Sequence, residues 1–516
     1  MGGEVKGGQD GRTHKGNTID DIPLWTLAWT YWGFICAILT AHFRRLIFWV
    51  CTLLGFLQED SAFLSAAGEC PLLKEKEYFY MRYMFGRIRD CWDRPICSRP
   101  GPLFQLMGRI FNYSIYGTFT YTGEKVPGIN LGSYNYLGFA ENAGTCIDHV
   151  IDAVNAYGVG PAGRKIEVGT MDLHKVLETR VANFVGKEDA VVFAMGYATN
   201  SCSLPALAGP GGLIISDSLN HASIVTGCRT SGAKIKTFKH NDPQDLERVI
   251  RQAIAEGQPR THRHWKKILI VVEGIYSMEG EILRLPEIIA IKKKYKAYLY
   301  VDEAHSIGAL GSRAKGVCDY YGTWGSLSLR DGHVLLACVD PKEVDILMGT
   351  FTKSFGSVGG YIAGDKDFVR YLRQTSFCSM YEETMSIPCA QMIISALNVI
   401  TGADGSNEGQ KRIKALRDNS NFFRNKLKEL GFRVAGDEDS PVIPLMLYHP
   451  AKIAGFSRLC LLENVAVVVV GFPATSLLAS RARFCISAGH TREQLERALD
   501  SISDIGDRLM LKYGEA

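Results

Sequence analysis

No C-x-x-C pair occurs among the 14 cysteines of this 516-residue sequence, which are scattered from Cys36 to Cys485. The spacing typical of zinc clusters and thioredoxin-type redox motifs is therefore missing, and no metal site is expected. We interpret the cysteines as buried, reduced thiols, because a chain of this length needs no disulfides to stabilise its core and reduced thiols are typical of cytosolic domains.

A strong net charge is missing as well. The 58 Lys and Arg residues are balanced by 54 Asp and Glu residues, which leaves a formal charge of +4. This balance excludes nucleic-acid binding driven by bulk positive charge. The hydrophobic share of 46% and the charged share of 22% are those of an ordinary folded protein, and the length allows several domains.

The third absence is of charged side chains over residues 22–42. This stretch is long enough to cross a bilayer as an α-helix, and its Trp and Tyr residues suit an interfacial aromatic belt. A second apolar run, 46–57, is too short to span. We predict a disordered polar tail over 1–21 and a membrane segment over 22–58, with a buried amphipathic helix and a cleaved signal peptide as competing interpretations.

No repeat of solenoid period is apparent in the rest of the sequence. Residues 59–126 lack a clean periodicity and are interpreted as an N-terminal arm or connector. Between residues 127 and 400, short apolar runs alternate with helical segments, which predicts a large α/β domain with a mainly parallel sheet covered by helices on both faces. Residues 401–516 predict a smaller α+β C-terminal domain.

Polar side chains follow several apolar runs of the predicted large domain. Parallel sheets bind ligands at the carboxyl ends of their strands, so these side chains form the candidate site. The candidates are Gly196, Tyr197, His221, Asp302, His305, Thr350, Thr352 and Lys353. Each of them alone also fits a capping, core or surface role, but the combination matches the needs of one cofactor.

That cofactor is pyridoxal 5′-phosphate (PLP). Lys353 offers the amine for a Schiff base, and Asp302 offers a carboxylate that would keep the pyridine nitrogen protonated. His221 is an imidazole that would stack on the ring face. A glycine-bearing turn at the start of a helix suits the phosphate. The groups expected to hold the phosphate are the amides of Gly196 and Tyr197 and the hydroxyls of Thr350 and Thr352.

Four motifs carry a family resemblance, namely GTFTKSFG (349–356), DEAHS (302–306), GYATN (196–200) and LNHAS (219–223). They resemble the α-oxoamine synthases, which are PLP-dependent transferases of fold type I. Runs such as NLGSYNYLGFA (130–140) and VVVVGFPAT (467–475) are most similar to the catalytic long-chain-base subunits of eukaryotic serine palmitoyltransferases. The resemblance covers nearly everything from about residue 93 to the C-terminus.

The resemblance implies a decarboxylating condensation of L-serine with palmitoyl-CoA to 3-oxosphinganine. It implies that Lys353 is the general base at the serine Cα, that His221 stacks on the ring and that His305 bonds the ring oxygen. Arg483 is expected to hold the serine carboxylate, since a guanidinium binds carboxylates bidentately, and its neighbour Arg481 is expected to form a surface ion pair. The expected partner is the non-catalytic long-chain-base subunit, in a heterodimer on the endoplasmic reticulum membrane with the catalytic body facing the cytosol.

Two features depart from the family pattern. An excess of residues lies between Tyr321 and Asp340, around 323–338, and the segment MYEETMSIP (380–388) places two carboxylates where a small-residue turn near the phosphate is usual. Two alternatives therefore stay open. One is a related synthase that condenses glycine with another acyl-CoA, and the other is a catalytically impaired or regulatory subunit of the same complex.

Overall fold

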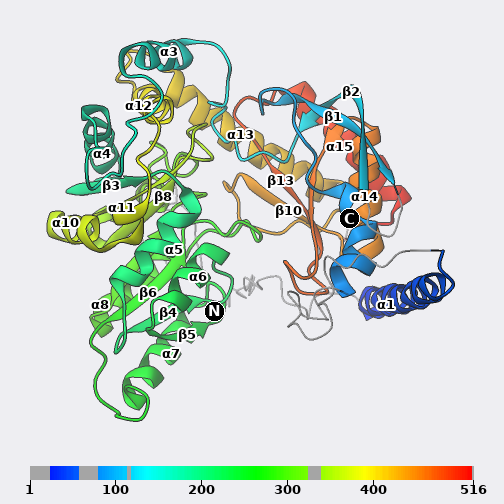
Figure 1. Cartoon of the computed structure of the whole chain (residues 1–516), viewed down its shortest axis with the longest axis horizontal. Helices are drawn as coiled ribbons and strands as arrows, with labels where there is room; N and C mark the ends of the chain where they lie inside the picture. Colours follow the sequence, from blue (N-terminus) through cyan, green and yellow to red (C-terminus); the bar gives the residue numbers. More distant parts are fainter. Residues whose placement is uncertain (1–23, 57–78, 113–117, 324–338, 514–516) are drawn as a thin grey trace, which may run out of the picture.

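The computed structural model describes residues 24–56, 79–112, 118–323 and 339–513. Figure 1 shows two lobes side by side, with helix α13 running between them and helix α1 at the outer edge of the C-terminal lobe. Outside the described residues lie the predicted tail (1–21), the ends of the predicted membrane segment (22–23 and 57–58), two parts of the predicted arm (59–78 and 113–117) and most of the excess segment (324–338).

The larger lobe is built on a seven-stranded sheet of order β3-β9-β8-β7-β6-β4-β5. Of the strands described in it, only β9 runs antiparallel to its neighbours, so the predicted mainly parallel α/β fold is confirmed. The strand residues are almost all buried because helices cover both faces. The strands are β3 (Asp189–Phe193), β4 (Leu213–Asp217), β5 (Lys234–Phe238), β6 (Ile268–Glu273), β7 (Tyr298–Asp302), β8 (Ile346–Thr350) and β9 (Gly360–Gly364).

Alternate strand residues point to opposite faces of this sheet, and each set packs on its own group of helices. On one face they meet α4 (Asp172–Val185), α7 (Pro243–Glu256), α8 (Leu285–Tyr295) and α12 (Ile387–Thr401). On the other they meet α5 (Gly196–Leu207), α6 (Ala222–Thr230), α10 (Lys366–Thr375) and α11 (Phe377–Tyr381). The lobe also contains α3 (Thr145–Tyr157), α9 (Val317–Thr323) and the 3₁₀ turn Pro341–Glu343.

Local sequence explains where these helices begin and end. Asp242 caps α7 by accepting the backbone N–H groups of Gln244 and Asp245 at 2.9 and 3.1 Å, and Pro243 fills the first helical position. Helix α4 ends at Gly186, which adopts a left-handed conformation with a φ of 73°. Such signals are local, which is why the helical segments were predictable from the sequence.

The smaller lobe holds a three-stranded antiparallel sheet of order β10-β13-β12 with its own hydrophobic core. A separate sheet joins the hairpin of the N-terminal region to this lobe, in the order β1-β2-β11. The elements are β1 (Leu103–Asn112), β2 (Thr118–Asn130), α13 (Glu408–Glu429), β10 (Val442–Met446), α14 (Pro450–Leu462), β11 (Val465–Ala466), β12 (Val468–Val470), β13 (Arg481–Cys485) and α15 (Arg492–Arg508).

Helix α1 (Leu24–Leu53) is long and apolar enough to cross a membrane, with a mean hydropathy of 1.6 in its candidate window. It continues without a break through Arg44 and Arg45, so the two apolar runs of the sequence form one helix. One face packs on the protein through Thr30, Phe34, Ala41 and Phe48. The remaining faces expose Trp, Leu and Phe side chains. Short turns at Tyr80–Met84, Phe85–Arg87 and Arg89–Cys91 follow before β1.

Candidate active site

The carboxyl ends of the parallel strands bring acidic and hydroxyl side chains to one edge of the large sheet. Asp217 ends β4, Glu273 ends β6, Asp302 ends β7 and Thr350 ends β8. Glu273 and Asp302 are paired neighbours in the register of β6 and β7. This edge is where the fold predicts ligand chemistry, and the segment that follows β8 carries Lys353.

The Lys353 amine lies close to the Asp302 carboxylate and is largely withdrawn from solvent. Burial lowers the pKa of Lys353 to about 8, and the nearby Arg483 cation lowers it further, while the carboxylates of Asp302 and Glu273 oppose the shift. The lysine is therefore partly neutral near physiological pH. A neutral amine in this position serves both as a nucleophile and as a base.

Hydrogen bonds fix the orientation of the Asp302 carboxylate. Asn200 Nδ2 donates to one oxygen at 2.7 Å, and the backbone N–H of Ala304 donates to the other at 2.8 Å. Asn200 is itself held by Tyr300, whose hydroxyl donates to the Asn200 side-chain oxygen at 2.7 Å. These bonds hold the Asp302 side chain in one orientation, and a carboxylate is the group that would pair with a pyridinium nitrogen.

His221 stands at the start of α6 with its side chain exposed at the site. Its Nδ1 accepts the backbone N–H of Ser223 at 3.2 Å, and its own backbone N–H donates to the Glu273 carboxyl group. Burial and the Lys353 charge lower the pKa of His221, and Asp302 opposes this shift. An uncharged ring with an exposed face can stack on an aromatic cofactor.

The start of α5 lies against the end of β8. A Cβ atom on Gly196 would approach Thr350 Cγ2 to 3.1 Å, so the lack of a side chain at residue 196 keeps this junction open. The Thr352 hydroxyl donates to the Thr350 hydroxyl at 3.3 Å. Tyr197 is half exposed, and its hydroxyl bonds Thr226 at 3.0 Å. A helix N-terminus beside two threonine hydroxyls is a suitable phosphate site.

The two arginines of β13 have different surroundings. Arg481 donates to the backbone oxygen of Met278 at 2.7 Å and pairs with Glu279 at 3.3 Å. It is 7% exposed, so the expected surface ion pair is in fact a buried one, because β13 lies inside its sheet. Arg483 is also buried, but its Nε atom has no hydrogen-bond partner among the described residues. An unpaired buried guanidinium N–H is a ready site for a carboxylate.

Sequence reasoning missed two tyrosines at the site. The Tyr136 hydroxyl forms a 2.7 Å hydrogen bond with His305 Nδ1, and the Tyr134 hydroxyl accepts a hydrogen bond from Arg483 Nη2. Burial and the charges of Lys353 and Arg483 lower the pKa of His305 well below its usual value. Both tyrosines belong to the run NLGSYNYLGFA, whose spacing alone does not distinguish a site residue from a core residue.

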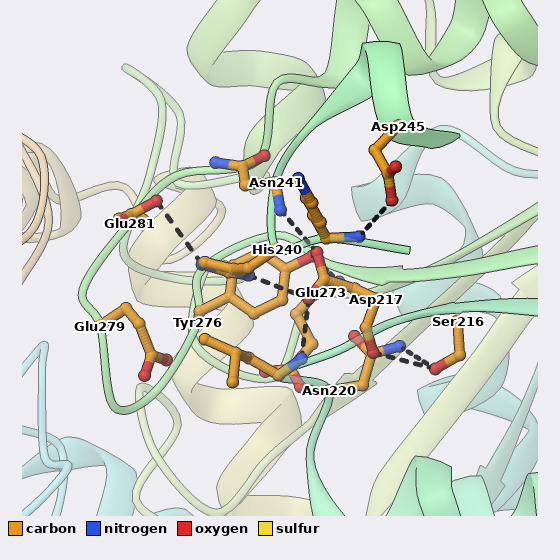
Figure 2. A network of polar contacts seen from close by, with 12 residues as sticks. Ser216, Asp217, Asn220, His240, Asn241, Asp245, Glu273, Tyr276, Glu279 and Glu281 are labelled. Carbon is orange, nitrogen blue, oxygen red and sulfur yellow. Dashed lines mark hydrogen bonds and ion pairs between the residues drawn. The ribbon is translucent and has the colours of Figure 1, made fainter. Parts of the chain in front are cut away.

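A polar network continues from the site toward β5 and the 273–282 turn (Figure 2). His240 Nδ1 lies 2.9 Å from the Asp217 carboxylate, His240 Nε2 lies 3.5 Å from Glu281, and the Tyr276 hydroxyl donates to Asp217 at 3.0 Å. Despite its burial, hydrogen bonds and charges from Asp217 and Glu281 raise the pKa of His240 to about 10. Burial beside Asp302 raises the pKa of Glu273 well above its usual value.

The unusual segment at 380–388 reaches the same junction. Glu382 receives the backbone N–H groups of Ala194 and Met195, directly before Gly196, and burial raises its pKa. Glu383 is exposed. Only one of the two extra carboxyl groups therefore lies at the predicted phosphate site, and its raised pKa reduces the negative charge there.

The residues present fit PLP on structural grounds. The partly neutral Lys353, the oriented Asp302 carboxylate and the open α5 terminus each match one part of the cofactor. The unpaired Nε of Arg483 leaves a separate anchor for a carboxylate ligand. Gly196, Tyr197, His221, Asp302, His305, Thr350, Thr352, Lys353 and Arg483 are thus the residues that the sequence predicted for this site.

Comparison with known proteins places the chain in a family. Residues 126–502 match the family model described as aminotransferase class I and II. Serine palmitoyltransferase 2 of Dictyostelium discoideum is 52% identical over 96% of this chain and 96% of its own length. Serine palmitoyltransferase 3 of Homo sapiens is 48% identical over 96% of this chain and 87% of its own length.

Solved structures agree with these relatives. A serine palmitoyltransferase of Sphingomonas wittichii superposes with a TM-score of 0.71 at 26% identity, over 86% of this chain and 99% of that one. A serine palmitoyltransferase solved with PLP superposes with a TM-score of 0.70 at 25% identity, over 85% of this chain and 100% of that one. The chain therefore belongs to the aminotransferase class I and II family, among the serine palmitoyltransferases, and is a PLP-dependent acyltransferase, as the sequence predicts.

Proposed function

We propose that this chain condenses L-serine with palmitoyl-CoA to give 3-oxosphinganine, CoA and CO₂. The observation that carries the proposal is the Lys353 amine, which has a pKa of about 8 and feels the charges of both the Asp302 carboxylate and the Arg483 guanidinium. Lys353 can take a proton there while Arg483 holds a carboxylate. The relatives named serine palmitoyltransferase support the same reaction.

PLP, when bound, supplies an electrophilic carbon for amines and a ring that accepts electron density from the amino-acid Cα. Asp302 would hold a proton on the ring nitrogen, because its carboxylate is fixed by Asn200 and Ala304. His221 would cover one face of the ring. His305, kept neutral by burial, would bond the ring oxygen through the nitrogen that Tyr136 does not occupy.

Arg483 would bind the carboxylate of serine through its unpaired Nε. Lys353 Nζ would then take the proton from the serine Cα, since its lowered pKa leaves part of it neutral. The Cα electron pair forms a bond to the thioester carbonyl carbon of palmitoyl-CoA, and the carbon–sulfur electrons leave with CoA. The bond from Cα to the serine carboxylate then breaks and CO₂ leaves. The electron pair of that bond stays on Cα, which takes a proton back from Lys353. The contact of the carboxylate with Arg483 therefore has to end during turnover.

We propose that the partner is the non-catalytic long-chain-base subunit, in a heterodimer. Large apolar side chains are exposed around the candidate site, including Val168 (78% exposed), Tyr381 (63%) and Met195 (58%). Apolar surface beside a site of this kind is suited to cover by a second chain.

Residues 127–400 and 401–516 are proposed as the large cofactor domain and the small closing domain.

We propose that α1 anchors the protein in the endoplasmic reticulum membrane as a single span, with the catalytic body in the cytosol. The support is the length of the helix and its exposed Trp, Leu and Phe side chains. Carbonate washing of membranes tests the anchor. Retention of the chain in the pellet is expected, and complete extraction would contradict a spanning helix.

The reaction is tested with the Lys353→Ala variant of the full chain, copurified with its partner subunit. The wild type is expected to show the visible absorption of lysine-bound PLP and to release CoA from palmitoyl-CoA only when L-serine is present. Lys353→Ala is expected to lose both, by at least about 10³-fold in rate. Lys342→Ala is the control, because Lys342 is exposed in the turn before β8. Serine-dependent CoA release that persists in Lys353→Ala would refute the proposal.

A further inference from the structure

Tyr134 contacts both cations of the candidate site. Its hydroxyl accepts a hydrogen bond from Arg483 Nη2. The Arg483 guanidinium carbon lies 4.8 Å from the centre of the Tyr134 ring, and the Lys353 amine lies 5.7 Å from the same centre. The ring also meets the His305 ring edge-on, at a centroid distance of 5.3 Å.

These contacts address an electrostatic problem of the site. Lys353 and Arg483 carry like charges, and the Arg483 charge disfavours protonation of Lys353. The face of an aromatic ring is negative and attracts cations, so the Tyr134 ring stabilises both charged groups. The hydrogen bond from Arg483 Nη2 to the Tyr134 hydroxyl also orients the guanidinium, because it holds one end of this planar group and restricts its rotation.

The other two nitrogens of the Arg483 guanidinium, Nη1 and Nε, have no short hydrogen bond to the described residues. Nη1 has long contacts only, 3.5 Å to the Ser277 backbone oxygen and 3.6 Å to Met278 Sδ, and Nε has no hydrogen-bond partner among the described residues. The hydrogen bond to Tyr134 is therefore shorter than the two contacts of Nη1, and it engages neither Nη1 nor Nε.

We propose that Tyr134 is a positioning residue for the amino-acid carboxylate. It fixes the Arg483 guanidinium so that Nε stays unpaired for the carboxylate. This inference rests on the proposed function, since it assigns the carboxylate of L-serine to Arg483. The inference about Tyr134 concerns recognition of a carboxylate and not the condensation step. An experiment can therefore refute the role of Tyr134 without refuting the proposed reaction, and the reverse.

The test compares L-serine with 2-aminoethanol, an amine that lacks the carboxylate. Dissociation constants are measured on the PLP-loaded full chain with its partner subunit, from the change in visible absorption on adding each amine. Tyr134→Phe keeps the ring and loses the hydroxyl, so it is expected to bind L-serine about tenfold more weakly and 2-aminoethanol as the wild type does. In steady state the KM for serine rises more than kcat falls.

Two further variants separate positioning from folding. Tyr361→Phe is the control, because Tyr361 is a buried tyrosine whose hydroxyl has no partner among the described residues; it is expected to bind both amines normally. In an Arg483→Lys background, Tyr134→Phe is expected to have no further effect on serine binding.

Two results would overturn the inference. One is a Tyr134→Phe enzyme that binds serine as the wild type does, and the other is one that loses serine and 2-aminoethanol equally. A wild-type enzyme that binds serine but never releases CoA from palmitoyl-CoA would instead refute the proposed function, and the comparison of the two amines would still decide the role of Tyr134.

Discussion

Ionisable neighbours shift the pKa of Lys353, and they do so in opposite directions. Asp302 and Glu273 favour the ammonium form, whereas Arg483 and the buried surroundings favour the amine, and the resulting pKa is about 8. The pKa of Lys353 therefore depends on individual side chains, because a single charge a few ångströms away shifts the pKa of a buried group by about one unit or more.

We predict that removal of a serine Cα proton speeds up as pH rises and levels off above about 8, where Lys353 is mainly neutral. Arg483→Gln removes a cation, so it should raise the pKa of Lys353 and move the plateau to higher pH. Arg483→Lys keeps the charge and serves as the control. Exchange of the serine α-hydrogen in deuterated buffer, followed by NMR at saturating serine, measures the step without palmitoyl-CoA. A profile that stays in place in Arg483→Gln would contradict the prediction.

At the scale of the elements, the 273–282 turn and the ends of β4 and β5 are joined through His240 (Figure 2). The imidazolium lies between Asp217 on β4 and Glu281 on the turn, and its ring meets Tyr276 edge-on at 4.3 Å. Glu273, at the end of β6, holds the backbone of His221. The network therefore fixes the segment on which a cofactor-facing histidine stands.

We predict that this network makes stability fall with rising pH. The folded pKa of His240, about 10, exceeds the unfolded value of about 6.5, so its contribution is full below pH 6.5 and is lost as pH rises toward 10. The total is on the order of 3 kcal/mol, given the partial exposure of the side chain. His240→Gln should flatten the apparent melting temperature between pH 7 and 9.5, and His262→Gln, in an exposed turn, should not. Equal slopes in all three proteins would contradict this account.

At the scale of the whole molecule, α1 is fastened to the small lobe at Gly33. A Cβ atom at Gly33 would lie 2.2 Å from Nε2 of His449, and the His449 side chain caps α14 by accepting the backbone N–H of Ala451 at 3.2 Å. The space between the two helices therefore excludes any side chain at this point.

We predict that Gly33→Leu separates α1 from the small lobe without releasing the chain from membranes. The apparent melting temperature in detergent should fall by about 2–5 °C, because one packed face is lost while the apolar helix is kept. Thr40→Leu is the control, since Thr40 lies on the exposed side of α1. Unchanged melting of Gly33→Leu would show that the contact contributes no stability.

The sequence predicted the parts of this molecule that local patterns encode. The alternation of apolar runs and helices indicated the mainly parallel sheet, and strand-end positions identified Asp302, Thr350 and Lys353. Tyr134 could not be found in this way, because its partner Arg483 is 349 residues away in the sequence. The buried Arg481 was misjudged for the same reason, since its surroundings come from a distant turn.

The contact of α1 with α14 also has a consequence for synthesis on the ribosome. Gly33 is made roughly 400 residues before His449, which at about 5–20 residues per second corresponds to roughly 20–80 seconds. Throughout that interval the packing face of α1 has no α14 to meet, while its outer faces are apolar from the start. The helix thus has time to reach a bilayer before the lobe that contacts it is made, so the proposed anchoring would precede folding of the catalytic body.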